Sequence, residues 1–180
     1  GQDMTSSRSD AVHHRLRGRE ARGFTLIELM VAITILAVLL AWAVPSFNNA
    51  ALSSKLTGFA NDLVSSTQIA RSEAIKRNAP ITLCASSNGT SCATSGGWEV
   101  GWILLRGTTV LQHHQALPTE FRIVQNGTFG ALTFPPDVVG TTAATFKVCR
   151  AVPVGREERT VRVTTSGGTA VARTETATCP

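Results

Sequence analysis

One carboxylate stands inside an otherwise apolar stretch of the sequence. Glu28 lies in the run Phe24–Val44, where two threonines are the only other polar residues. An unpaired carboxylate at membrane depth costs several kcal/mol, so Glu28 needs a partner. If the chain is cut after Gly23, the new amine of Phe24 is such a partner, provided that it belongs to a neighbouring helix with an axial offset. This chemistry would stack helices into a filament.

The four cysteines are the next residues that could do chemistry. An even number of cysteines in an exported segment is typical of disulfides in an oxidising compartment. The spacings Cys84-x7-Cys92 and Cys149-x29-Cys179 match no common zinc pattern. The bridges Cys84–Cys92 and Cys149–Cys179 are the simplest of the three pairings, and we expect no metal.

Residues for catalysis are missing from the sequence. It contains no Gly-rich phosphate loop, no nucleophile elbow and no cluster of metal ligands. His113 and His114 would point to opposite sides of an extended strand, which suits a surface strand better than an active site. The sequence therefore predicts neither an enzyme nor a cofactor.

Arginines near the C-terminus are candidates for contact with DNA phosphates. In a strand, Arg156 and Arg162 would project to one side and Arg159 to the other. The intervening pair Glu157-Glu158 lowers the local potential. Solubilising groups on an outer strand are the simpler interpretation of these arginines and Arg173.

The elements that would position these residues fall into three parts. Residues 1–23 carry five arginines against three acidic residues, which is +2 of the total net charge of +5. Residues 24–45 form about 30 Å of helix, the thickness of a bilayer core. Arginines beside an apolar span mark its cytoplasmic side, so the remainder would be exported. A simple signal anchor would also cross the membrane once.

Residues 46–79 carry the pattern of an amphipathic helix. Pro45 removes one backbone hydrogen bond and predicts a kink or local melting at its start. The helix should end near Arg77-Asn78, because Ala79-Pro80 stops it. The apolar positions that recur at helical spacing are Leu52, Leu56, Phe59, Leu63, Ala70 and Ala74.

Residues 80–180 predict a β-rich globular domain, because short apolar runs alternate with turn residues. Trp98 and Trp102 would share one face of a strand, against the helix. The expected strands are Ile81–Ala85, Trp98–Leu105, Thr109–Gln112, Phe121–Gln125, Leu132–Phe134, Thr145–Arg150, Arg159–Thr164 and Thr169–Arg173.

The stretch from Gly23 to Val31, GFTLIELMV, resembles the class III leader and N-terminal motif of type IV pilins and type II secretion pseudopilins. The resemblance implies that prepilin peptidase recognises Gly23 and that Phe24 becomes the N-methylated first residue. It also implies that Glu28 pairs with the amine of an adjacent subunit during assembly. Pro45 falls where such pilins have a helix-breaking proline.

A second block, ARSEAIKRN at residues 70–78, precedes a strand with Cys84 and a Trp-x3-Trp pair. This combination resembles the pseudopilin group of FimT, FimU and GspH. It implies an α+β pilin fold, in which a long hydrophobic N-terminal α-helix packs on a C-terminal antiparallel β domain. The implied location is the bacterial inner membrane, with a single pass and a periplasmic domain, followed by the pilus or pseudopilus.

Three functions are consistent with this resemblance. The first is a minor pilin in the priming or tip complex of a type IV pilus; Cys179-Pro180, reaching back towards Cys149, resembles the FimU-like members. The second is a type II secretion pseudopilin. The third is a FimT-like DNA-binding pilin, although residues 166–173 keep only the glycine and the last arginine of the Gly-Arg-x-Arg pattern of those relatives. The implied partners are other major and minor pilins or pseudopilins, prepilin peptidase and the inner membrane.

Overall fold

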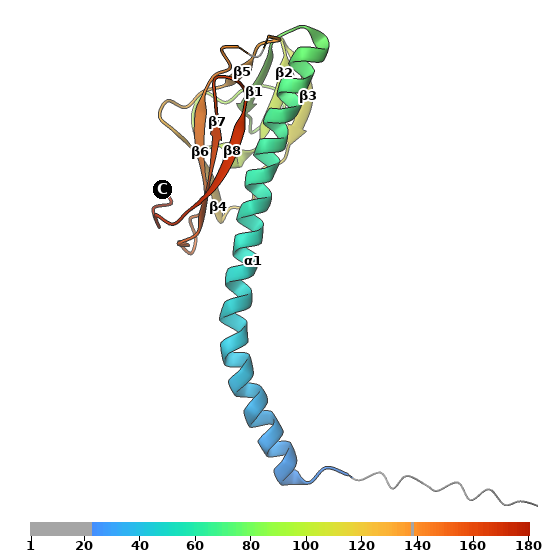
Figure 1. Ribbon diagram of the computed structural model, residues 1–180, viewed down its shortest axis with the longest axis vertical. Helices are drawn as coiled ribbons and strands as arrows, with labels where there is room; N and C mark the ends of the chain where they lie inside the picture. The colour runs from blue at the N-terminus through green and yellow to red at the C-terminus, as the bar shows by residue number, and fades with distance from the viewer. Residues whose placement is uncertain (1–22, 138) are drawn as a thin grey trace, which may run out of the picture. The chain divides into compact units, whose positions relative to one another are not determined.

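The structure is a computed structural model that describes residues 23–137 and 139–180. The expected leader, residues 1–23, lies outside this range except for Gly23. The described chain contains one long helix, one 3-10 helix and eight strands (Figure 1). In chain order they are α1 (Leu26–Arg77), β1 (Ile81–Ala85), η1 (Trp98–Val100), β2 (Trp102–Arg106), β3 (Thr109–His114), β4 (Phe121–Asn126), β5 (Leu132–Phe134), β6 (Ala144–Arg150), β7 (Glu158–Val163) and β8 (Thr169–Thr174).

The chain divides into two units, with the boundary between Val44 and Pro45. Helix α1 has 52 residues and contributes to both units. It continues through position 45, which corrects the expectation of local melting there. A proline removes a single N–H from the hydrogen-bond ladder, and α1 tolerates that loss.

Both ends of α1 are fixed by local hydrogen bonds. At the start, the Glu28 N–H donates to the Thr25 hydroxyl at 3.2 Å, so Thr25 caps the helix. At the end, Asn78 takes a left-handed φ of +47°, a conformation that asparagine tolerates. The Ala79 N–H then donates to the Ala74 carbonyl at 3.2 Å. Pro80 follows, and the helix ends at Arg77, where the sequence predicts it.

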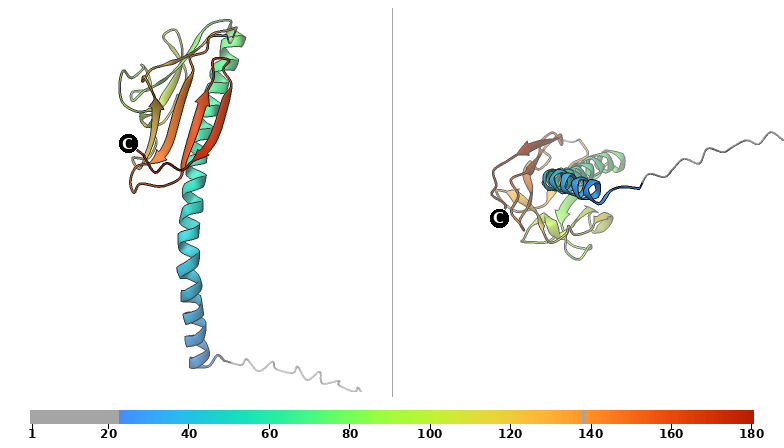
Figure 2. Two further views of the ribbon diagram at one scale, coloured as in Figure 1. Left: turned by 60° about the vertical axis from the view of Figure 1, so that its left-hand side comes forward. Right: turned by 90° about the horizontal axis from the view of Figure 1, so that it is seen from below.

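In the second unit, eight strands form two antiparallel sheets of four strands each. Their orders are β3-β2-β1-β5 and β4-β6-β7-β8. Figures 1 and 2 show the strands beside the C-terminal part of α1. The fold is therefore the α+β arrangement that the sequence predicts, with a long helix packed on antiparallel sheets.

The core of the second unit lies between α1 and the sheets. Leu56 and Leu63 of α1 are completely buried. Beside them, the rings of Phe59 and of Phe121 in β4 form a T-shaped pair, with centroids 4.9 Å apart. Burying a leucine or phenylalanine side chain contributes about 1.5–3 kcal/mol, so this apolar stripe holds the helix to the sheets.

The two tryptophans do not share a strand, so this expectation was wrong. Trp98 begins η1, and Trp102 begins β2. Gly101 separates them with a φ of +102°, and a Cβ there would come within 2.6 Å of the His114 carbonyl oxygen. Only glycine fits this turn without strain. Trp98 packs edge-on against Phe146 of β6 instead, and Trp102 donates its indole N–H to Ser66 of α1 at 2.8 Å.

Candidate functional site

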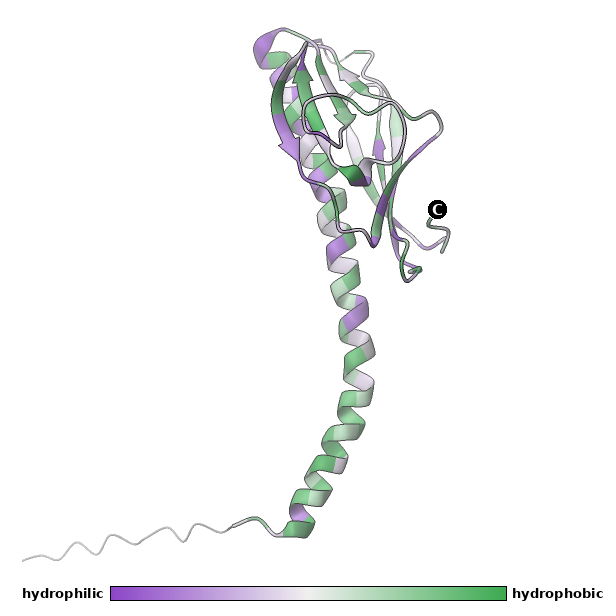
Figure 3. Cartoon of the chain, turned by 180° about the vertical axis from the view of Figure 1, so that it is seen from behind, coloured by the Kyte–Doolittle hydropathy of each residue, from purple (hydrophilic) through white to green (hydrophobic). Residues whose placement is uncertain are grey.

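The N-terminal segment presents an apolar surface with one carboxylate. Every side chain from Phe24 to Val44 is exposed, and Figure 3 shows this part of α1 as mostly hydrophobic. By length and composition, α1 contains a stretch that could cross a membrane. Such a surface is unfavourable in water and is stable in lipid or against other apolar helices.

Glu28 is the acidic residue in the first turn of α1. Among residues 23–137 and 139–180, no group forms a hydrogen bond or an ion pair with its carboxylate. Its backbone N–H is bound by Thr25, so Thr25-x-x-Glu28 is half of a capping box. This cap uses the backbone N–H of Glu28 and leaves its carboxylate without a partner among the described residues.

Gly23 and Phe24 precede the helix and are accessible. Both lie outside α1, and the Phe24 side chain is 83% exposed. A bond in an exposed, non-helical segment can enter the active site of a peptidase, whereas a helical bond would first have to unwind. The geometry therefore allows cleavage after Gly23.

Two disulfides join the four cysteines in the pairing that the sequence favours. Cys84 of β1 is bonded to Cys92, and Cys149 of β6 is bonded to Cys179 near the C-terminus. The first bridge joins cysteines that are 8 residues apart in the sequence. The second joins cysteines that are 30 residues apart and ties the C-terminal segment to the sheet. A bridge across a longer loop restricts the unfolded chain more, so the second should stabilise the domain more.

A buried carboxylate holds the same C-terminal segment. Glu158 of β7 is completely buried. It accepts hydrogen bonds from the Thr176 hydroxyl at 2.6 Å and the Thr178 N–H at 3.1 Å, and Lys147 lies 3.6 Å away. Burial by itself raises the pKa of Glu158, but the bonds from Thr176 and Thr178 and the charge of Lys147 outweigh it, so the pKa is lowered.

Glu158→Gln is expected to lower the free energy of unfolding at pH 7 by about 2 kcal/mol, the contribution of hydrogen bonds to a charged group. Because the folded pKa of Glu158 lies below its ordinary value of 4.5, its stabilisation is present above pH 4.5 and is lost as the pH falls through the folded pKa. Urea unfolding of both proteins from pH 7 to pH 3 should therefore give curves that converge in acid. Glu73 also has a lowered pKa, chiefly because Arg77 donates a hydrogen bond to it. Its effect on the pH dependence of stability is the same in both proteins and cancels in their difference.

A constant difference between the two proteins across that pH range would contradict this assignment. Glu120→Gln is the matched control, because the Glu120 side chain is exposed. It should show a smaller loss at pH 7.

The two histidines do not lie in a metal site. His114 stacks on Trp102 with ring centroids 3.8 Å apart, and its Nε2 lies 3.4 Å from the Asp62 carboxylate. His113 of β3 lies against Gly89 instead. In the described part of the chain, no group of three or more His, Cys, Asp or Glu side chains could hold a metal ion.

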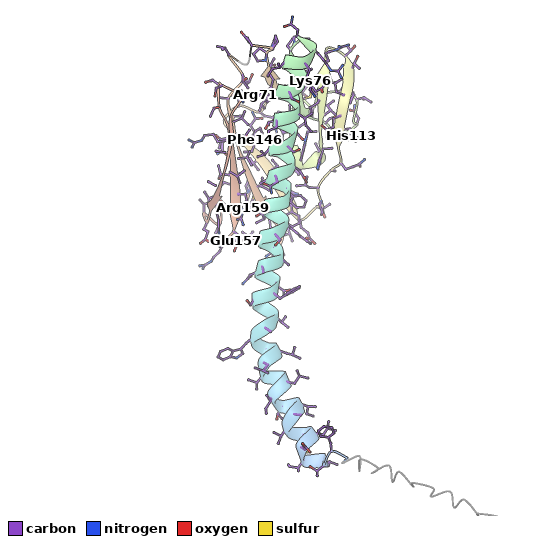
Figure 4. The ribbon with its side chains drawn as sticks, turned by 45° about the vertical axis from the view of Figure 1, so that its right-hand side comes forward. Arg71, Lys76, His113, Phe146, Glu157 and Arg159 are labelled. Carbon is purple, nitrogen blue, oxygen red and sulfur yellow. A yellow bond between two sulfur atoms is a disulfide. The ribbon has the colours of Figure 1, made fainter. Side chains whose placement is uncertain are left out.

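The four arginines considered for DNA contact have different environments. Arg156 and Arg162 are exposed, but Arg159 is only 7% exposed. Figure 4 shows Arg159 beside α1, where it donates to the Ser53 hydroxyl at 2.7 Å and the Thr57 hydroxyl at 3.1 Å. Arg159 therefore does not present its guanidinium to a DNA phosphate, which corrects that expectation.

Arg173 of β8 is occupied by two carboxylates. It donates to Glu157 at 2.8 Å and to Glu175 at 3.0 Å. These pairs neutralise its charge locally. The alternation of side chains along a strand predicts that Arg159 and Arg162 lie on opposite faces of β7. It does not show that the face with Arg159 packs against α1, about a hundred residues earlier in the chain.

Two sequence families match the chain. A model described as Type II transport protein GspH matches residues 60–168. A model described as the prokaryotic N-terminal methylation motif matches residues 18–44. No curated protein matches the chain.

Solved structures with a similar fold include two crystal forms of the type IV minor pilin FimU of Pseudomonas aeruginosa (strain PAO1). The P65 form has 20% identity and a TM-score of 0.51, covering 65% of this chain and 92% of that one. The P21 form has 19% identity and a TM-score of 0.53, covering 66% of this chain and 89% of that one.

A third structure is the minor pseudopilin EpsH from the Type 2 Secretion System of Vibrio cholerae. It has 12% identity and a TM-score of 0.50, covering 65% of this chain and 95% of that one. These matches show a shared pilin fold. Because the GspH model spans more than half of the 180 residues, the chain belongs to the GspH family of pilin-like proteins.

Proposed function

We propose that this protein is a minor pilin of a type IV pilus that joins the complex which primes assembly near the filament tip. The precursor enters the inner membrane through residues 24–45 and exposes its domain to the periplasm. Prepilin peptidase cuts after Gly23, and Phe24 is N-methylated. The helix then moves from lipid into a bundle with other pilins.

The observation that carries this proposal is the exposed apolar surface of Phe24–Val44 with Glu28 inside it. Burial between helices would stabilise these side chains, since each contributes about 1.5–3 kcal/mol. The carboxylate restricts the arrangements that this apolar surface allows. An arrangement that brings an N-terminal amine to Glu28 avoids an unpaired buried charge, so the pair sets the register.

A type II secretion pseudopilin is the second candidate. It is favoured by the match to the family described as a type II transport protein and by the similarity to EpsH. The bridge between Cys149 and Cys179 supports the first candidate, because the C-terminal cysteine resembles that of FimU-like minor pilins. DNA binding is not part of the proposal, because Arg159 is buried and Arg173 is paired.

Cross-linking in the native host followed by affinity purification would distinguish the two systems. The tag belongs on an exposed loop of the domain, such as the turn at Gly107, where added atoms meet no neighbour. Recovery of the other minor pilins of a type IV pilus supports the proposal. Recovery of secretion pseudopilins alone would assign the protein to the second candidate.

Gly23→Ser is expected to block cleavage, so that the protein in the membrane keeps its leader. The reason is that a peptidase which admits glycine at this position has little room for a side chain, although Gly23 itself lies in open space in the free chain. Mass spectrometry of the intact membrane protein measures the retained leader. Gly18→Ser, five residues upstream, is the matched control and should be processed normally. A fully processed Gly23→Ser protein would refute the assigned cut.

A further inference from the structure

A pocket of about 390 Å³ lies between α1 and the loop that joins β6 to β7. Asn49 and Leu52 line it from the helix, and Arg150 lines it from the end of β6. Val154 and Arg156 line it from the loop, which is called the 151–157 loop below. All of these residues belong to the second unit of the chain.

Two arginines in this pocket have no acidic partner. The Nε atom of Arg150 is buried and has no hydrogen-bond acceptor in the described part of the chain. Neither Arg150 nor Arg156 forms an ion pair with any residue in 23–137 or 139–180. A buried donor without an acceptor is destabilising, so an acceptor supplied from outside would be stabilising.

The acidic residues that line the pocket do not cancel this charge. Glu157 and Glu175 both accept hydrogen bonds from Arg173, and Glu157 also lies 3.7 Å from Arg159. Arg173 and Arg159, which do not line the pocket, therefore offset the charges of these two carboxylates, and the Oε2 atom of Glu157 is buried without a hydrogen bond within the described residues. The positive charges of Arg150 and Arg156 are not paired with a carboxylate, so the pocket favours the binding of an anion.

The chemistry of the anion follows from the side chains. A guanidinium presents its N–H groups in a planar fork that matches the oxygens of a phosphate or a carboxylate. Beside the arginines, the 151–157 loop exposes two apolar side chains, with Val152 64% and Val154 58% exposed. Apolar side chains next to arginines suit the boundary of a bilayer. There the apolar side chains enter the acyl region, and the arginines bind lipid headgroups.

The length of the chain keeps the pocket near a membrane. Asn49 follows Val44, the last residue of the apolar run, by five residues. Five residues span at most about 18 Å, whatever the arrangement of the two units. If the apolar run spans the inner membrane, lipid headgroups at its periplasmic end are within reach of the pocket.

We propose that this pocket binds the phosphate of an anionic phospholipid headgroup through Arg150 and Arg156 while the subunit is in the membrane. Val152 and Val154 then contact the acyl boundary beside the bound headgroup. The inference rests on the proposed membrane-anchored stage. It adds a lipid site that holds the domain against the membrane before the subunit leaves for the filament.

The test uses the full chain in nanodiscs that contain photoactivatable phosphatidylglycerol or, separately, photoactivatable phosphatidylcholine. Cross-linked peptides are mapped by mass spectrometry. We expect cross-links on the 151–157 loop with phosphatidylglycerol at about 25 times the yield found with the zwitterionic lipid, because each of two basic side chains near an anionic surface contributes about a factor of five. Arg156→Gln should lower the yield about fivefold. Arg106→Gln, which removes another exposed arginine, should leave it unchanged.

Arg156 is the decisive position, because it is exposed and its replacement should not disturb folding, whereas Arg150 is partly buried. Equal yields with the two lipids, or an unchanged yield with Arg156→Gln, would overturn the inference. Cross-links along Phe24–Val44 are the internal control. Their absence would refute the membrane-anchored stage itself, whereas their presence without cross-links on the loop would refute only the lipid site.

Discussion

Glu28→Ala is expected to leave leader cleavage intact and to reduce incorporation into filaments at least about tenfold, since a lost pairing of about 1.4 kcal/mol already changes an equilibrium by that factor. The carboxylate costs free energy in the membrane, so its removal should not harm insertion. What is lost is the charge that meets the amine of a neighbouring subunit. Immunoblots of sheared surface fractions measure incorporation, and mass spectrometry of the membrane fraction measures cleavage.

Two further substitutions separate charge from local structure. Glutamine can replace glutamate in a capping box, so Glu28→Gln preserves any role of this residue in capping α1. If the charge sets the register, Glu28→Gln should fail in assembly as Glu28→Ala does. Thr34→Ala is the matched control, because the Thr34 hydroxyl donates to the Val31 carbonyl of its own helix at 2.8 Å. Normal assembly of Glu28→Gln would contradict the proposed amine partner.

The helix was predictable because its signals are local. The apolar run ends at Val44, the stripe from Leu52 to Ala74 follows the helical period, and Asn78 with Pro80 marks the end. The strands were predictable to within a residue or two wherever turn residues flank them. Gly101 is the exception, because a single glycine with positive φ divides the expected strand Trp98–Leu105 into a 3-10 helix followed by a strand.

The environment of the charged residues could not be read from the sequence. Alternation along a strand assigns side chains to two faces, but it does not say which face meets a helix. Arg159 and Arg162 look alike in the sequence, yet one is buried against α1 and the other is exposed. Glu158 is similar: its partners, Thr176 and Thr178, come from a segment held near it by the bridge at Cys179. Such contacts depend on tertiary packing.

Arg159→Ala is expected to lower the free energy of unfolding of the domain by about 2–4 kcal/mol, because it removes charged hydrogen bonds and leaves a cavity in a buried site. The guanidinium joins β7 to α1 through Ser53 and Thr57 and lies 3.7 Å from Glu157. Urea unfolding of the full chain in detergent measures the effect. A Trp42→Phe background restricts the fluorescence to Trp98 and Trp102, which are both buried in the domain.

Arg162→Ala is the matched control, because Arg162 lies on the same strand and is exposed. Its substitution should change stability by less than about 0.5 kcal/mol, as surface substitutions usually do. Arg159→Met keeps most of the side-chain volume and removes the hydrogen bonds. The loss of stability in this variant therefore measures the contribution of the guanidinium separately from that of the cavity. If Arg159→Ala is as stable as Arg162→Ala, the guanidinium does not hold α1 to the sheet.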